Sequence, residues 1–281
     1  MTKPSTMPPN AESDDQPTYS LQRGRLPLLV SLPHVGTELP ADLTARMAAR
    51  ATEVEDTDWH LARLYRFAQD LGASLLVPRF SRYVVDLNRP VANAPMYPGV
   101  NNTELCPTRF FTGEPLYLPG QAPDKAEVAQ RVDQYWRPYH QALADELARL
   151  KAAHGHAVLF DGHSIKGELP WLFDGRLWDL NLGTADGQAC APALQQQLDQ
   201  VLDGQQRYSH ISNGRFKGGH ITRRYGQPGQ GVHAVQLEMC WHCYMDDGPP
   251  YTYDEAKAAQ VTPLLRQLLQ TMVDWRPDSA A

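Results

Sequence analysis

The sequence predicts an α/β fold in which a central sheet carries helices on both faces. Apolar runs of roughly four to eight residues, the length of buried strands, alternate along the chain with longer segments of helical pattern. Such alternation is typical of α/β sheets. The length of 281 residues suits one large domain of this class and is short for two average domains with linkers.

Apolar runs define the predicted strands in chain order. The first, PLLVSLP at 27–33, stops at His34, and the helical pattern DWHLARLYRFAQDLG follows at 58–72. Further apolar runs occupy 73–80, 82–88, 156–163 and 233–245. Because open α/β sheets bind ligands outside the carboxyl ends of their strands, the polar residues that end these runs are the first candidates for a site.

The clearest helix is predicted for 124–154. Asp124 suits its N-cap, and Gly155 suits the position just past its end. Pro138 predicts a break or a kink, since proline cannot donate the helical hydrogen bond. The preceding segment 90–123 is dense in Pro, Gly, Asn and Thr, which predicts a long irregular excursion of the kind that is usually functional or disordered.

Composition limits the domain bounds, the location and the partners that we expect for the protein. Residues 1–25 lack the apolar core of a signal peptide, so we expect a flexible tail on a cytoplasmic protein and a single catalytic domain over 26–276. The net charge of -6 gives no general attraction to nucleic acid or anionic membranes. No run approaches the roughly 18 apolar residues of a spanning helix. The four cysteines are too scattered for a disulfide framework and fit a reducing compartment.

Polar side chains that could carry chemistry stand at or near the ends of the apolar runs. They are His34, Asp86, Asn88, Arg89, His163 and Glu238. Asp56 and Asp58 stand at the head of the predicted helix 58–72. Two histidines and a carboxylate can hold a divalent ion such as zinc with a position open for water, as catalytic sites require. Glu238 could be a general base, since a carboxylate inside an apolar strand is costly unless it is paired or used.

Several of these residues also have a structural interpretation. A single histidine after a strand is more often a hydrogen-bonded structural residue. Asp161 favours a ligand role for His163, because a carboxylate two residues away could orient the imidazole. Asp56 and Asp58 could simply cap a helix, whose dipole favours carboxylates in the first turn.

Two arginines could meet an anionic substrate. Arg89 could form a structural ion pair with Asp86 or a fork for a substrate carboxylate. The segment 216–226 lacks the spacing of a phosphate loop, and it places His220 and Arg223 in a turn that faces solvent or an anionic substrate.

Cys240 and Cys243 form a C-x-x-C pair, for which we expect buried thiols rather than zinc, because the chain has no second ligand pair at similar spacing. On a continuous strand the two cysteines would face opposite sides. Two rival functions remain open. One is a metal-free thiol hydrolase that uses Cys240 with His242 or His220. The other is a non-catalytic module that binds anionic amino-acid derivatives.

Seven stretches together carry a resemblance from about Pro27 to the C-terminal helix. They are SLPHVGTELP, DTDWHLARLY, SRYVVDLNRP, FDGHS, DLNLGT, FKGGHITRRYG and QLEMC. The combination resembles the N-formylglutamate amidohydrolase (N-formylglutamate deformylase) family. The resemblance implies a three-layer, zinc-carboxypeptidase-like (phosphorylase/hydrolase-like) fold with a mixed, mostly parallel sheet. It also implies metal-dependent hydrolysis of N-formyl-L-glutamate to formate and L-glutamate in histidine degradation.

The resemblance assigns one divalent metal ion, zinc by preference, to the site. His34 and His163 would be ligands, with Asp58 favoured as the acidic ligand and Asp56 as its alternate. Glu238 would be the general base and acid, by similarity to the metallocarboxypeptidases. Those peptidases carry a glutamate three residues after the first histidine, whereas this chain has threonine there.

Substrate contacts follow from the same similarity. Asn88 and Arg89 would receive a substrate carboxylate, and Arg82 or Arg223 could stabilise the oxyanion. His220 is a further candidate contact. The expected partner is a small N-formyl amino acid, without nucleic acid or membrane, bound by a monomer or a small homo-oligomer.

Overall fold

The computed structural model describes residues 17–94 and 101–277. Within them lies a sheet of seven strands in the order β1-β3-β2-β4-β7-β5-β6. The strands are β1 Tyr19–Gln22, β2 Leu28–Ser31, β3 Ser74–Pro78, β4 Ala157–Ile165, β5 Leu180–Gly183, β6 His210–Ser212 and β7 Val232–Cys240. Four pairs are parallel, and only β1 with β3 and β5 with β7 are antiparallel among the described strands. The predicted mixed, mostly parallel sheet is confirmed.

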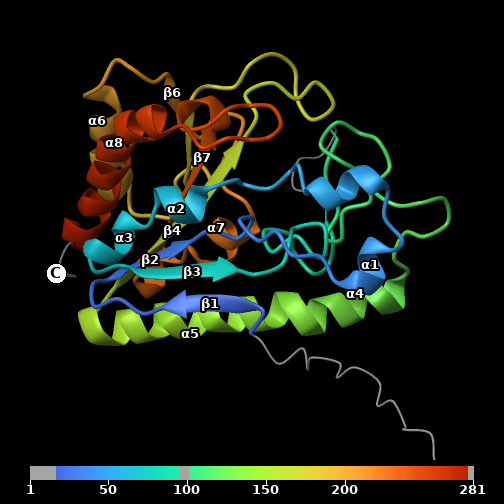
Figure 1. The fold of residues 1–281 in the computed structure, drawn as a ribbon. Coiled ribbons are helices and arrows are strands. Elements are labelled where there is room, and N and C mark those ends of the chain that lie inside the picture. Colours follow the sequence, from blue (N-terminus) through green and yellow to red (C-terminus); the bar gives the residue numbers. More distant parts are fainter. Residues whose placement is uncertain (1–16, 95–100, 278–281) are drawn as a thin grey trace, which may run out of the picture.

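Helices cover both faces of this sheet (Figure 1). The α-helices are α1 Ala41–Thr44, α2 Leu61–Leu64, α3 Phe67–Asp70, α4 Lys125–Arg131, α5 Arg137–His154, α6 Pro192–Asp203, α7 His220–Tyr225 and α8 Glu255–Asp274. Single turns of other helix types are η1 Ala49–Glu53, η2 Val132–Trp136, η3 Pro228–Gln230 and η4 Trp241–Cys243. Core side chains of α2, α3, α6 and α8 pack on one face, and those of α5 and α7 on the other.

The strand β2 shows why the apolar runs are continuous rather than alternating. Leu28 and Val30 belong to the core under α8, and Leu29 to the core under α5. Successive side chains point to opposite faces, and both faces are covered, so consecutive positions are apolar until Ser31, whose buried hydroxyl is hydrogen-bonded to that of Tyr139. Such burial on both sides holds the carboxyl ends of β2, β4 and β7 in fixed positions.

Part of the segment predicted as an N-terminal tail is an ordered strand. Residues 19–22, which fall inside the predicted tail, form β1 and pair antiparallel with β3 from Tyr19 opposite Pro78 to Gln22 opposite Leu75. This short strand alternates half-buried and exposed side chains, the pattern of an edge strand that composition alone does not reveal. Residues 1–16 of the predicted tail lie outside the described residues.

The predicted helix 58–72 is two one-turn helices, α2 and α3. Tyr65 and Phe67 are both buried in the same core, with ring centroids 5.9 Å apart. Residues two apart do not share a face of a continuous helix, so the break between α2 and α3 lets both rings reach the core.

The predicted helix 124–154 is confirmed with one interruption. The Asp124 carboxylate accepts a hydrogen bond from the Glu127 N–H, and Gly155 ends the helix with φ of 79°. The wide turn η2 separates α4 from α5 just before Pro138. This π-helical turn is the predicted break, and Pro138 falls in the first turn of α5, where a missing N–H costs little.

The run 82–88 is not a strand, as its pattern suggested, but a series of turns. The guanidinium of Arg82 pairs with the Asp86 carboxylate, four residues on. Residues four apart on a strand are about 13 Å apart, so only a turn permits this contact. The Asp86 N–H donates to the Leu105 carbonyl at 2.7 Å. Tertiary contacts thus override the apolar pattern. The irregular excursion is confirmed for 90–94 and 101–123.

The predicted run 233–245 is a strand only as far as Cys240, after which the chain turns in η4. The thiols of Cys240 and Cys243 therefore do not diverge. They donate to the neighbouring carbonyls of Trp178 and Asp179, at 3.3 Å and 3.9 Å. Both thiols are buried, as predicted.

In the described parts of the chain, no helix combines the length and the apolar character that crossing a bilayer requires.

The N-cap of α8 is a testable element of the fold. The Asp254 carboxylate accepts hydrogen bonds from the N–H groups of Ala256 and Lys257, at 2.9 Å and 3.0 Å. Asp254→Ala removes that acceptor and should lower the free energy of unfolding. For a chain of this size the melting temperature should fall by about 2–4 °C. Asp254→Asn keeps an acceptor without the charge and should lose much less. Equal losses would assign the effect to charge instead.

Candidate active site

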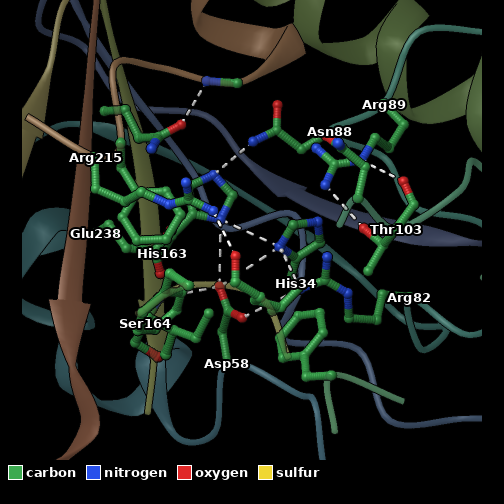
Figure 2. A pocket seen from close by; sticks show the side chains of 18 of the residues that line it. His34, Asp58, Arg82, Asn88, Arg89, Thr103, His163, Ser164, Arg215 and Glu238 are labelled. Carbon is green, nitrogen blue, oxygen red and sulfur yellow. Dashed lines mark hydrogen bonds and ion pairs between the residues drawn. The ribbon is translucent and has the colours of Figure 1, made fainter. Parts of the chain in front are cut away.

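A pocket opens at the carboxyl ends of the parallel strands β2, β4 and β7 (Figure 2). It holds about 670 Å³ of space not filled by atoms, including its open mouth, which suits a small amino-acid derivative. Of the predicted site residues, seven line this pocket: His34, Asp58, Arg82, Asn88, Arg89, His163 and Glu238. They come from five separate segments of the chain, which the sheet brings together.

The centre of the pocket is a group of three buried donors, His34, Asp58 and His163. The Nδ1 atoms of His34 and His163 lie 3.2 Å apart. Asp58 Oδ2 lies 3.7 Å from His34 Nδ1 and 3.3 Å from His163 Nδ1. His34 lies three residues past β2, and its carbonyl accepts the Asp58 N–H at 3.0 Å. His163 lies inside β4, two residues before its end, rather than after the strand.

A carboxylate stands behind each imidazole. Asp86 Oδ1 lies 2.8 Å from His34 Nε2, and Asp161 Oδ1 lies 3.1 Å from His163 Nε2. Asp161 and His163 share a face of β4 because they are two residues apart. Both Nδ1 atoms face Asp58 Oδ2. Asp86 accepts a hydrogen bond from His34 Nε2, whereas Asp161 lies beside the His163 ring at ion-pair distance, where its charge can orient the imidazole.

This donor set fits a divalent ion of the size of zinc. Ligand distances of about 2.0–2.1 Å in a tetrahedral arrangement place donors about 3.3 Å apart. The separations of 3.2, 3.3 and 3.7 Å among the three donors bracket that value. Three protein ligands would leave a fourth position open, as catalytic sites do.

The electrostatics of the group also suit a cation. Burial alone would raise the pKa of Asp58, but the two histidines hold it well below its usual range. Burial alone would lower the pKa of His163, but Asp161 and Asp58 raise it well above its usual value. Asp58 is thus ionised inside the protein, and the positive charge that balances it sits where an ion would bind.

Asp56, the alternate acidic ligand, points elsewhere. Its Oδ2 accepts hydrogen bonds from the Tyr83 hydroxyl at 2.8 Å and from the Phe111 N–H at 3.0 Å. Burial raises the pKa of Asp56 to about 6. Asp56 therefore anchors the excursion 101–123 to the turn that precedes α2, and the structure brings Asp58 to the donor group.

Glu238 faces the donor group from the neighbouring strand. It stands opposite His163 in the parallel register of β4 with β7. Burial, partly opposed by His163 and supported by Asp58, raises the pKa of Glu238 to about 8. A carboxyl group that can gain and lose a proton near neutral pH suits general acid–base chemistry. Glu238 is not a member of the donor group itself.

The two predicted pocket arginines have different surroundings. Arg82 is buried, pairs with Asp86, and places Nη1 3.3 Å from His34 Nδ1. Arg89 donates from Nε to the Thr103 carbonyl at 3.1 Å and from Nη2 to the Thr103 hydroxyl at 2.8 Å. Asp86 pairs with Arg82 rather than with Arg89, so the structural ion pair considered for Arg89 is not the one observed.

Asn88 links the donor group to α7. Its Nδ2 lies 3.0 Å from His163 Nε2, and its Oδ1 accepts the Ile221 N–H at 2.8 Å. Gly219 makes room for this amide: a Cβ there would lie 2.2 Å from Asn88 Nδ2. In this structure Asn88 therefore positions His163.

His220 and Arg223 are not among the pocket-lining residues. The His220 ring packs against Trp136 and His140, with centroids 5.8 Å and 5.6 Å away. Arg223 is exposed, and its Nε donates to the Gly218 carbonyl at 2.9 Å. Their predicted substrate contacts have no support in the described structure, because the segment 220–225 is a short helix whose N-terminus, not these side chains, meets the pocket.

Part of the pocket wall consists of residues that the sequence did not predict. Asn101, Asn102, Thr103 and Phe111 come from the long irregular excursion, and Leu172, Phe173, Arg215 and Phe216 come from two loops beyond β4 and β6. The excursion was expected to be functional or disordered, and nothing in it singled out individual residues. Arg215 directly precedes the motif FKGGHITRRYG, and that proximity was the available signal.

A second mixed group, Asp179, His242 and Cys243, lies outside the pocket. His242 Nε2 lies 2.8 Å from Asp179 Oδ1 and 3.4 Å from Arg176 Nη2. Burial raises the pKa of Cys240 to about 12 and that of Cys243 further, so neither thiol is a ready nucleophile.

Comparisons with known proteins agree with this arrangement. A family model described as N-formylglutamate amidohydrolase matches residues 26–245. N-formylglutamate deformylase of Pseudomonas aeruginosa is 50% identical over 256 residues, which is 91% of this chain and 96% of that protein. The deformylase of Pseudomonas putida is 47% identical over the same coverage.

Solved structures support the same fold. The crystal structure of N-formylglutamate amidohydrolase from Ralstonia eutropha superposes with a TM-score of 0.75 at 26% identity, covering 91% of this chain and 96% of that one. A gene product of Agrobacterium tumefaciens superposes with a TM-score of 0.69 at 19% identity, covering 91% of this chain and 94% of that one.

The contact between Gly219 and Asn88 generates a prediction. Gly219→Ala should push the Asn88 amide away from His163 and weaken zinc binding at the donor group about 10- to 100-fold, the usual effect of losing an orienting partner. Zinc affinity measured by competition with a chromophoric chelator tests it.

Two further variants serve as controls. Gly229→Ala should change nothing, since a Cβ at Gly229 meets no atom within 4 Å. Asn88→Ala should lose about as much as Gly219→Ala, and the double variant no more, because both act through one amide. Full zinc affinity in Gly219→Ala would show that Asn88 does not hold His163.

Proposed function

The chain belongs to the N-formylglutamate amidohydrolase family, and from that premise we propose that it hydrolyses N-formyl-L-glutamate to formate and L-glutamate with one divalent ion, zinc by preference. The observation that carries the proposal is the donor group of His34, Asp58 and His163, spaced for an ion and faced by the buried Glu238. From the family resemblance alone we also propose that the reaction serves histidine degradation. The cytoplasmic location and the oligomeric state remain predictions.

A divalent ion held by the donor group would make water more acidic and polarise a carbonyl. The protein's own groups would supply the proton transfers and the positioning. Glu238 would take the proton of the attacking water and return it to the departing amine nitrogen of glutamate. The formyl C–N bond breaks as the new C–O bond forms, so the products are formate and L-glutamate.

Two arginines would bind charge on the substrate. Arg82 is buried beside His34 and would donate to the formyl oxygen as negative charge develops there. Arg89, already oriented by Thr103, would hold a carboxylate of the substrate. The cost of orienting the Arg89 guanidinium is met by Thr103 before the substrate arrives, which favours binding.

The rival functions have less support. A thiol hydrolase needs a thiolate near a base in the pocket, whereas Cys240 and Cys243 are buried outside it with raised pKa values. A purely binding module would not need Glu238 beside an ion site. A formate-release assay on the purified protein, run with metal analysis, separates all three, because only the proposed enzyme loses turnover to chelators and regains it with zinc.

Metal dependence has a direct mutational test. His34→Ala removes one of three ligands and should abolish both formate release and most of the bound zinc, measured by elemental analysis. His210→Ala is the matched control, since His210 pairs with Asp203 on the surface and should keep both. A His34→Ala protein with a full zinc complement would overturn the ligand assignment.

The role of Glu238 is tested by removing its proton acceptor without its shape. Glu238→Gln should keep the zinc content of the wild type while kcat falls by about 10²–10⁴, the usual contribution of general acid–base catalysis. Glu168→Gln, at an exposed glutamate, should leave both unchanged. If the Glu238→Gln protein keeps wild-type turnover, another group is the base.

A further inference from the structure

The pocket contains an arginine that the proposed mechanism does not use. Arg215 lies in the loop between β6 and α7 and lines the pocket together with the donor group. In Figure 2 Arg215 lies on the side of Glu238, whereas Arg89 lies on the side of Thr103. Two guanidinium groups therefore reach the pocket from different loops.

Arg215 is held in a defined orientation. Its Nη2 donates to the Leu172 carbonyl at 2.7 Å, and its guanidinium carbon lies 5.8 Å from the centroid of the Phe173 ring. The side chain is half-buried. A guanidinium fixed in this way by a carbonyl and an aromatic ring loses little further freedom when it binds an anion, which favours recognition of a carboxylate.

On the pocket side, apolar side chains adjoin Arg215. Leu172 and Phe173 contact it, Phe216 follows it in the chain, and all three line the pocket. By contrast Arg89 directly follows Asn88, whose amide touches His163. One arginine is therefore reached along an apolar wall, and the other stands next to the residues that hold the reacting centre.

N-formyl-L-glutamate has two carboxylates that match this division. Its α-carboxylate is bonded to the carbon that carries the reacting amide nitrogen, so it must stay close to the donor group. Its γ-carboxylate stands at the end of two methylene groups, which need apolar surroundings. We propose that Arg215 binds the γ-carboxylate, with the methylene groups against Leu172, Phe173 and Phe216, while Arg89 binds the α-carboxylate. This assignment rests on the proposed function and makes Arg215 the residue that selects a dicarboxylic substrate.

Substrates that lack one charge test the assignment. Formate release is measured for N-formyl-L-glutamate, for N-formyl-L-glutamine, which lacks the γ-charge, and for N-formyl-L-isoglutamine, which lacks the α-charge. Arg215→Ala should lower kcat/KM for N-formyl-L-glutamate about 10- to 100-fold, the loss expected for a charge-assisted pair, and change that for N-formyl-L-glutamine less than about threefold. Arg215→Lys should lie between the wild type and Arg215→Ala.

The comparison is internal to each variant, so a lower folded fraction cancels. Arg207→Ala, at an exposed arginine that donates to Gln260, is the matched control and should keep the wild-type preference. Arg89→Ala should show the opposite pattern. It should lower kcat/KM for N-formyl-L-glutamate but hardly change kcat/KM for N-formyl-L-isoglutamine, which lacks the α-charge. The coupling between each side chain and each carboxylate is read from the cycle of variant and substrate.

Three results would overturn the proposal. Equal losses on N-formyl-L-glutamate and N-formyl-L-glutamine would make Arg215 a purely structural residue. If Arg215 is coupled to the α-carboxylate instead, the assignments of Arg215 and Arg89 to the two carboxylates must be reversed. If the wild type releases formate from none of the substrates, the proposed function fails, and titration calorimetry of L-glutamate and L-glutamine then decides on Arg215. Arg215→Ala should weaken the binding of L-glutamate but not that of L-glutamine. Equal effects on the binding of both amino acids would refute the γ-carboxylate site.

Discussion

The convergence of two imidazole nitrogens on one buried carboxylate is the constraint around which the site is organised. The Nδ1 atoms of His34 and His163 lie 3.2 Å apart, while Asp86 accepts a hydrogen bond from the opposite nitrogen of His34 and Asp161 lies 3.1 Å from that of His163. Each of these carboxylates is held in turn, Asp86 by Arg82 and Asp161 by the Thr222 hydroxyl. Buried charges survive only when they are paired and hydrogen-bonded, so the network specifies one arrangement of the pocket.

The charge balance of this network favours a cation. The pKa values of the buried Asp58 and Asp86 are held well below the usual range, so these two carboxylates are negative, and the buried Arg82 beside them supplies one positive charge, which leaves an excess of one negative charge. In the protein without an ion, a raised pKa of His163 partly compensates this excess. A divalent ion at the donor group would compensate it fully, so ion binding should release a proton from His163.

Much of this arrangement could be predicted from the sequence, and the predictions that were wrong or missing have a common cause. The strands around His34, His163 and Glu238 are buried on both faces, so their apolar runs are strong local signals. The turn at 82–88 could not be predicted, because it is held by contacts to Leu105 and His34 that no local pattern encodes. For the same reason Arg215 was missed and His220 misplaced: only the fold decides which loop residues face the pocket.

The two histidines differ in how far along the chain their neighbouring carboxylates lie. Asp161 and His163 share one strand, so their relation exists as soon as β4 is extended. His34 and Asp86 are 52 positions apart, and Asp86 also needs the long excursion to bring Leu105 to its N–H. Local opening of that excursion would release His34 while leaving His163 and its carboxylate in place, so amide protons at 86–88 should exchange before those of β4. His163 and Asp161 thus belong to the stable sheet, whereas the pairing of His34 with Asp86 also requires the irregular excursion to pack against the turn at 82–88.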